Sequence, residues 1–176
     1  MIILDTSFLY SLLNKRDTNH VIAEKLFDEI VNQNKFGKPV IFEYVLDEFL
    51  TIIGNKHPFA YVKRVVDFIS LNIEQGIFLL ITLDGRDALY DTIKLFKKLN
   101  EDKTCFLSFT DCAIIFSMLK NRISYLASFD SDFNKVLDKI EEGVYKDKGF
   151  KGDEKPHLLR WRWIVPFVVK FFNAKC

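Results

Sequence analysis

The feature of this 176-residue sequence that most limits its fold is an alternation of short apolar runs with longer segments of helical periodicity. The short runs have the length and apolar content of buried strands, and they lie at residues 1–5, 40–42, 77–83 and 125–128. Strands separated by helices pair in parallel through right-handed crossovers. The sequence therefore predicts an α/β fold, with three α/β/α layers around a central parallel sheet of about four to five strands.

The segments between these runs carry apolar residues three or four positions apart, which predicts helices. We expect helices near residues 8–13, 21–31, 44–53, 59–75, 85–99 and 110–119. Gly54 is expected to end the third of these helices, because glycine is common just after a helix C-terminus. The last helix is apolar on nearly all sides, which indicates that it is buried.

Composition and charge exclude several classes of protein. Hydrophobic residues make up 49% of the chain, too many for an intrinsically disordered protein. The formal net charge of +1 supplies no strong field that would gather nucleic acid over the whole surface. The cysteines Cys105, Cys112 and Cys176 show no paired spacing, which argues against a disulfide framework. With neither a signal peptide nor an apolar run of about 18–20 residues, the chain is expected to be cytoplasmic and without a membrane span.

The end of the chain differs from the rest. Residues 1–145 have the alternating pattern of one domain, whereas residues 146–176 form a basic, aromatic C-terminal extension. Within it, the run Arg160–Trp163 has the side chains that stack on bases and contact phosphates, or that cover an interface. The apolar stretch Trp161–Phe172 is expected to pack on a partner, on a second copy or on the body of this chain.

Acidic residues occupy the positions where such a fold binds ligands. In an open parallel sheet the ligand site lies beyond the carboxyl ends of the strands. Asp5 ends the first predicted strand, Asp130 follows the last, Asp111 opens the buried helix, and Glu48 borders the apolar side of the helix after the second strand. Carboxylates gathered together repel one another unless a cation lies between them. Oxygen ligands of this kind suit Mg²⁺ or Mn²⁺, which can activate water for phosphodiester hydrolysis.

Each of these acids also has a purely structural explanation, which the sequence leaves open. Asp5 can cap the helix that begins near Ser7. Asp111 follows Ser108 by three residues, the spacing of a capping box. Asp130 and Asp132 can form Asx turns. Another alternative is a phosphatase of the haloacid-dehalogenase type, but that chemistry needs a second aspartate at the position of Ser7.

Motifs in residues 1–140 point to a known family. They are IILDTSFLYSLLNKRDTNH, VLDEFL, LSFTDCAIIFSM and ASFDSDF. In this order and spacing they resemble the PIN-domain nucleases, above all the VapC-type toxins of prokaryotic toxin–antitoxin pairs and their archaeal relatives. Such domains usually end soon after the last strand, so the chain after about Gly149 departs from the family pattern.

The resemblance implies a Mg²⁺- or Mn²⁺-dependent endoribonuclease that cuts single-stranded regions of RNA. It implies that Asp5, Glu48, Asp111 and Asp130 are the catalytic and metal-binding acids, supported by Thr6, Ser108, Thr110 and Asp132. It also implies a homodimer and, for the toxins, a small antitoxin whose tail occupies the active-site groove. The alternative is a catalytically silent domain of the same fold that binds RNA or protein.

Overall fold

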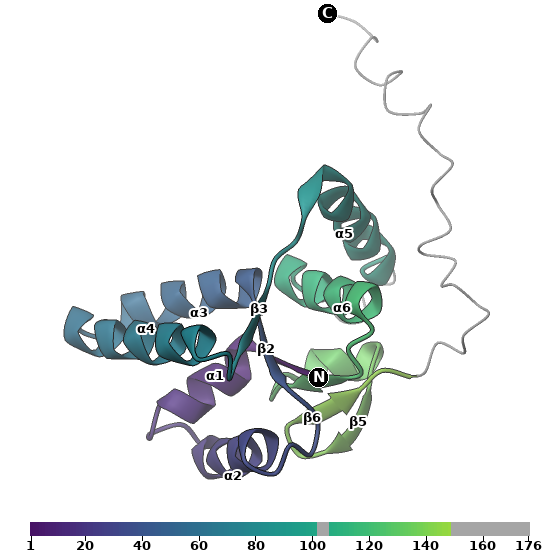
Figure 1. The fold of residues 1–176 in the computed structure, drawn as a ribbon. Helices are drawn as coiled ribbons and strands as arrows, with labels where there is room; N and C mark the ends of the chain where they lie inside the picture. Colours follow the sequence, from purple (N-terminus) through teal and green to yellow (C-terminus); the bar gives the residue numbers. More distant parts are fainter. Residues whose placement is uncertain (102–105, 149–176) are drawn as a thin grey trace, which may run out of the picture.

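The computed structural model describes residues 1–101 and 106–148, and its centre is a six-stranded sheet in the order β3-β2-β1-β4-β6-β5 (Figure 1). The strands are β1 (Ile2–Leu4), β2 (Pro39–Phe42), β3 (Leu79–Ile81), β4 (Tyr125–Ala127), β5 (Asp138–Glu141) and β6 (Val144–Lys146). The pairs among β1, β2, β3 and β4 are parallel, whereas β6 runs antiparallel to both β4 and β5. This order places β1 between β2 and β4, in the middle of the parallel part.

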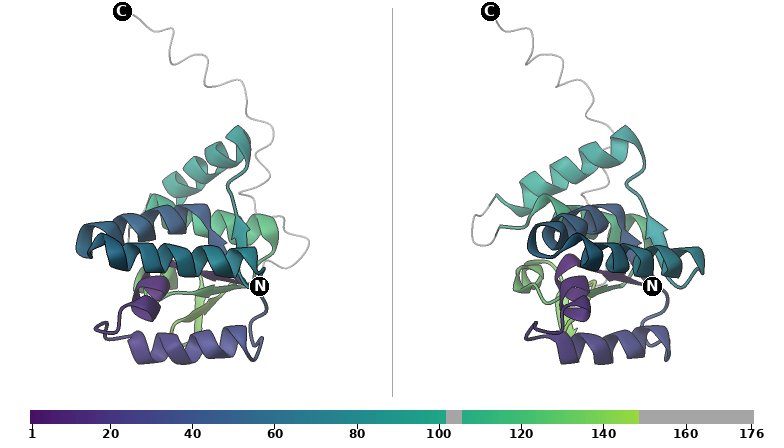
Figure 2. Two further views of the ribbon diagram at one scale, coloured as in Figure 1. Left: turned by 60° about the vertical axis from the view of Figure 1, so that its left-hand side comes forward. Right: turned by 90° about the vertical axis from the view of Figure 1, so that its left-hand side faces the viewer.

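Helices cover both faces of the sheet. They are α1 (Thr6–Leu13), α2 (His20–Val31), α3 (Glu43–Lys56), α4 (Phe59–Glu74), α5 (Gly85–Leu99) and α6 (Phe109–Asn121). A short 3₁₀-helix, η1 (Ser131–Lys135), follows β4. Figures 1 and 2 show α1 and α2 on one side of the sheet and α5 and α6 on the other. The predicted α/β/α class is confirmed.

The core lies around the inner strands. Every residue of β1 and β2 is buried, including Ile3 and Phe42, which have no exposed surface. In α6 the run Cys112–Met118 is buried, as its apolar sequence predicted. Fully burying an aliphatic or aromatic side chain stabilises a fold by about 1.5–3 kcal/mol. The carboxyl end of β1 is therefore anchored in the hydrophobic core.

The sheet has one hairpin that the sequence did not predict. Strands β5 and β6 turn at Gly143, whose φ of +78° is unfavourable for other residues. A Cβ at Gly143 would also lie 3.0 Å from the ring of Phe129. The four strands β1–β4 form the predicted parallel sheet, and the antiparallel hairpin adds two strands that the prediction did not include. Strand β5 escaped prediction because its residues are mostly exposed and polar, so no apolar run marks it.

Two other boundaries differ from prediction. The run at 77–83 gives only the short edge strand β3, since the backbone N–H groups of Ile77 and Phe78 donate to the carbonyl of Asn72 at the end of α4. Helix α3 continues through Gly54, and it ends where Pro58 forces the preceding His57 into an extended conformation.

The predicted boundary at residue 145 falls inside β6, and it stays a prediction because most of the extension lies outside the described residues. Within residues 1–101 and 106–148, none of the helices combines the length and the apolar character needed to span a bilayer.

Candidate active site

Asp5 lies at the carboxyl end of β1 and is also the N-cap of α1. Its backbone N–H donates to the carbonyl of Ala127, which extends the ladder beside β4. Its side chain is 4% exposed, and its Oδ2 accepts hydrogen bonds from the Ser7 backbone N–H at 3.3 Å and the Ser7 hydroxyl at 2.6 Å. The predicted capping role is therefore correct. The cap holds the Asp5 carboxylate in a position from which water is largely excluded.

A pair of serines joins Asp5 to the loop that carries Asp130. The Ser128 hydroxyl donates to Asp5 Oδ2 at 2.8 Å, and the Ser7 and Ser128 hydroxyls are 3.1 Å apart. Ser128 Oγ in turn accepts from the Asp130 backbone N–H at 3.0 Å. Burial raises the pKa of Asp5, and the hydrogen bonds from Ser7 and Ser128 oppose that rise. The sequence analysis missed both serines, although each lies two residues from a predicted acid.

Glu48 reaches this region from α3. Thr6, the first residue of α1, donates from its Oγ1 to Glu48 Oε2 at 2.7 Å. Glu48 is half-buried, whereas its neighbour Asp47 is exposed, as the helix periodicity predicted. Thr6 is thus placed beside Asp5 in sequence and in contact with Glu48 in space.

Asp111 forms the capping box at the start of α6. Its Oδ2 accepts from the Ser108 backbone N–H at 2.7 Å, and its own N–H donates to Ser108 Oγ at 3.0 Å. Burial raises the pKa of Asp111 most, hydrogen bonds from Ser108 lower it, and the negative charges of Asp5 and Asp130 raise it further. The capping explanation is correct, and the same carboxylate lies within the electrostatic reach of two other acids.

Asp130 caps η1 and is hydrogen-bonded to the β5–β6 hairpin. Its Oδ1 accepts from the Asp132 backbone N–H at 2.8 Å, which is the Asx geometry predicted for this pair. Its backbone carbonyl accepts from the hydroxyl of buried Tyr145, at 2.8 Å. Burial raises the pKa of Tyr145, and Asp130 raises it further. The unpredicted strand β6 therefore supports the loop that holds Asp130.

The four acids lie around the end of β1, but they do not form a finished ligand cage. Asp111 lies within the electrostatic reach of Asp5 and Asp130, and Glu48 accepts a hydrogen bond from Thr6, the residue that follows Asp5. Among residues 1–101 and 106–148, no group of three or more His, Cys, Asp or Glu side chains is placed closely enough to hold a metal ion. In the same residues, no hydrogen bond joins Thr110 to the acids.

Ion pairs that would compensate the charge of this cluster are absent among residues 1–101 and 106–148. In the part of the chain that the structure describes, no lysine or arginine forms an ion pair with Asp5, Glu48, Asp111 or Asp130. Burying carboxylates costs several kcal/mol unless they are protonated, paired or bound to a metal. Oxygen-only donors suit Mg²⁺ or Mn²⁺. The donor set therefore fits such an ion.

Cys112 is next to Asp111 but is unsuited to either nucleophilic or metal-binding chemistry. The residue is buried, and burial raises the pKa of its thiol to about 12, with the Asp111 charge contributing. A thiol needs to be deprotonated to act as a nucleophile or metal ligand. The chemistry of this region therefore rests on oxygen atoms.

The raised pKa values give a testable dependence of stability on pH. A carboxyl that binds protons more tightly in the folded than in the unfolded state stabilises the fold fully at low pH. That contribution is lost as the pH rises through the folded-state pKa. In the metal-free protein we therefore expect Asp111→Asn to gain melting temperature relative to the unmodified chain as the pH rises from about 4 to 7. Differential scanning fluorimetry in EDTA measures this.

Asp91→Asn is the matched control, since Asp91 lies on α5 and pairs with Lys94. Its melting temperature should follow that of the unmodified chain at every pH. Parallel pH curves for Asp111→Asn and the unmodified chain would contradict the raised pKa of Asp111, which comes from burial first and from the neighbouring charges second.

A known protein family matches the part of the chain that contains the four acids. The model of the PIN domain family matches residues 2–139. The fold is similar to that of Mycobacterium tuberculosis VapC20, described as a sarcin-ricin loop cleaving toxin, with a TM-score of 0.60 and 20% identity over 76% of this chain and 93% of that one. It is also similar to a chain of the Rickettsia felis VapBC2 complex, solved with a DNA fragment from its promoter. That match has a TM-score of 0.54 and 17% identity over 77% of this chain and 92% of the other. No curated protein matches the sequence.

Proposed function

Because the chain belongs to the PIN domain family, we propose that it is a Mg²⁺- or Mn²⁺-dependent endoribonuclease that hydrolyses phosphodiester bonds in single-stranded regions of RNA. The observation that carries the proposal is the gathering of Asp5, Asp111 and Asp130 at the end of β1 without ion pairs to described residues. A cluster in which one carboxylate is buried and its neighbours are half-buried gains stability from a divalent ion. A divalent ion also binds and polarises the oxygens of a phosphodiester.

Asp5, Glu48, Asp111 and Asp130 are the residues that would hold the metal. When bound, it supplies Lewis-acid polarisation of a phosphodiester oxygen and acidifies a water molecule. The side chains of the chain itself orient the reactants. Ser7 and Ser128 fix the orientation of the Asp5 carboxylate, and Thr6 fixes that of Glu48.

Asp111 and Asp130 each use one carboxylate oxygen in a local cap, through Oδ2 and Oδ1 respectively. The other oxygen of each can accept a hydrogen bond from an attacking water, which is the role of a general base. In this proposal Ser108 and Asp132 support the two acids through those caps. Thr110 supports the site from the first turn of α6.

The biological setting is part of the same proposal. The two solved structures named above are a VapC toxin and a VapBC complex. By analogy, the chain is a VapC-type toxin that acts in the cytoplasm as a homodimer and is inhibited by a small antitoxin protein.

Metal removal and one substitution test the activity. The full chain with Mn²⁺ should cleave a single-stranded RNA, and excess EDTA should abolish cleavage. We expect Glu48→Gln to lower the cleavage rate at least about tenfold, because loss of groups that support a metal typically costs 10–100-fold. Asp47→Asn, the exposed neighbour on α3, should leave the rate unchanged.

Several outcomes would count against the proposal. Cleavage that persists in EDTA would exclude metal dependence. Binding of RNA without cleavage in Mg²⁺ or Mn²⁺ would favour the catalytically silent binding domain. Equal cleavage of duplex and single-stranded RNA would contradict the proposed substrate.

A further inference from the structure

An apolar groove lies away from the acidic cluster, between α5, α6 and the end of the described chain. It encloses about 140 Å³, and its lining includes Leu95, Leu99, Ile115, Met118, Leu119 and Lys148. Leu99 and Leu119 are only half-buried, so the groove is open to solvent. Its α6 residues lie at least one turn beyond Asp111, which separates the groove from the proposed catalytic residues.

The size of the groove suits an aromatic side chain. A protein cavity of roughly 150 Å³ lined by aliphatic side chains binds a benzene ring. A groove of this size and lining is therefore large enough for one ring of phenylalanine or tryptophan. Apolar concave surfaces of this kind are typical of binding sites rather than of free surface.

We propose that this groove binds the chain's own apolar segment, Trp161–Phe172. The structure describes the chain up to Lys148, and Lys148 itself lines the groove. Residues 149–160 separate it from the segment, and an extended chain of that length spans up to roughly 40 Å. The segment is therefore within reach of the groove, and the covalent link gives it an effective concentration in the millimolar range.

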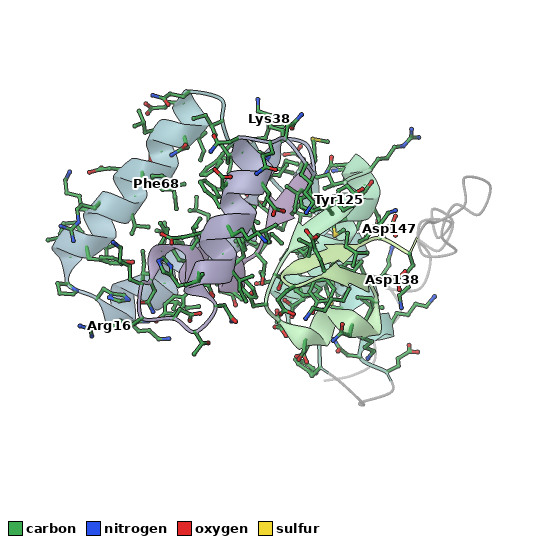
Figure 3. The ribbon with its side chains drawn as sticks, turned by 90° about the horizontal axis from the view of Figure 1, so that it is seen from below. Arg16, Lys38, Phe68, Tyr125, Asp138 and Asp147 are labelled. Atoms are coloured by element: carbon green, nitrogen blue, oxygen red, sulfur yellow. The ribbon has the colours of Figure 1, made fainter. Side chains whose placement is uncertain are left out.

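Charge supports the same occupant. The groove lining holds Lys135 and Lys148 as well as Asp147. Lys148 pairs with Asp138 and Lys135 donates to the Leu99 carbonyl, whereas Asp147 forms no ion pair with any residue in the described ranges. Figure 3 shows Asp147 near Asp138, where the β5–β6 hairpin ends. Arg160, directly before the segment, and Arg162, within it, stand on either side of Trp161. A guanidinium that pairs with a half-buried carboxylate forms a strong, charge-assisted hydrogen bond. One short stretch of the chain thus supplies both an aromatic ring for the groove and an arginine for its rim.

Tryptophan fluorescence of the full chain tests this proposal directly. The protein has two tryptophans, Trp161 and Trp163, and both lie in the proposed segment. Docking should shift their emission to shorter wavelength than that of free N-acetyltryptophanamide and protect them from acrylamide quenching. Both effects should be independent of protein concentration. Leu119→Glu should abolish the shift, because it places a charge in the groove.

Leu71→Glu is the matched control, since Leu71 is half exposed on α4 and lies outside the groove. It should leave the emission unchanged. Asp147→Lys is a second groove variant in case Leu119→Glu loses its far-UV circular dichroism signal, and it should increase acrylamide quenching.

Three results would overturn the proposal. The first is emission typical of water-exposed tryptophan in the unmodified chain. The second is a blue shift that both groove variants leave intact, which would place the segment elsewhere. The third is a blue shift that grows with concentration together with dimer formation, which would assign the groove to a second copy. None of these readouts depends on nuclease activity, so the inference is separable from the proposed function.

Discussion

The Asp5→Asn variant is expected to lose RNA cleavage by at least about 100-fold while it keeps its fold. Groups that only support a metal ligand cost 10–100-fold when removed, so loss of a ligand at the centre of the cluster should cost at least that much. Asparagine caps helices as well as aspartate does. Its amide oxygen can still accept the hydrogen bonds that Ser7 and Ser128 donate to Oδ2. Cleavage rates at saturating Mn²⁺ and thermal melting measure the two properties.

The same variant separates catalytic loss from structural damage. Asp5 is buried near Asp111 and Asp130, so removal of its charge should maintain or raise the melting temperature of the metal-free protein. Mn²⁺ should raise the melting temperature of the unmodified chain, because an ion that binds only the folded state stabilises it. It should raise that of Asp5→Asn much less.

Asp67→Asn is the control for this experiment, since Asp67 lies exposed on α4 and pairs with Lys63. It should retain full activity and the full response to Mn²⁺. A normal rate of cleavage by Asp5→Asn would refute the assignment of this residue, and the metal-centre proposal with it.

The Phe49→Ala variant should reduce the free energy of unfolding by about 3–5 kcal/mol. Phe49 has no exposed surface, and it lies next to Glu48 on α3. Truncating a buried phenylalanine removes its transfer free energy and leaves a cavity that the surrounding core fills only partly. Because small domains are stable by only about 5–15 kcal/mol, the loss is a large share of the total. Urea unfolding followed by circular dichroism measures it.

Phe59→Ala provides the comparison, since Phe59 is 79% exposed at the start of α4. Its effect should remain within about 0.5 kcal/mol, as for most surface substitutions. A loss for Phe49→Ala as small as that expected for Phe59→Ala would mean that the packing of α3 on the sheet contributes little to stability.

Local sequence signals predicted the elements in which one periodicity dominates. The apolar run ending at Asp5 gave β1, and the continuous apolar stretch after Asp111 gave the buried helix α6. Strand β5 escaped because Asp138–Glu141 satisfies its backbone by pairing with β6 and carries no apolar pattern. A strand that is stabilised by backbone pairing rather than by burial of its side chains has no apolar pattern by which the sequence could reveal it.

The candidate site shows the same division. The acids could be proposed because each stands at a strand end or a helix start, and the family resemblance picked out the same positions. Ser7 and Ser128 could not, because their hydroxyls meet across 121 positions of sequence. Only the parallel pairing of β1 with β4 brings them together. The apolar groove likewise depends on how α5 packs against α6, which periodicity does not specify.

The capping contacts of the acids have a consequence for how such a protein can change over generations. In Asp5, Asp111 and Asp130, one oxygen of each carboxylate fastens a local turn or helix start. Asparagine fastens the same turns. Substitution of one of these aspartates by asparagine would thus remove the proposed activity and leave the fold intact. A descendant of the proposed nuclease that no longer needs its activity could keep this scaffold intact and use its surfaces for other functions.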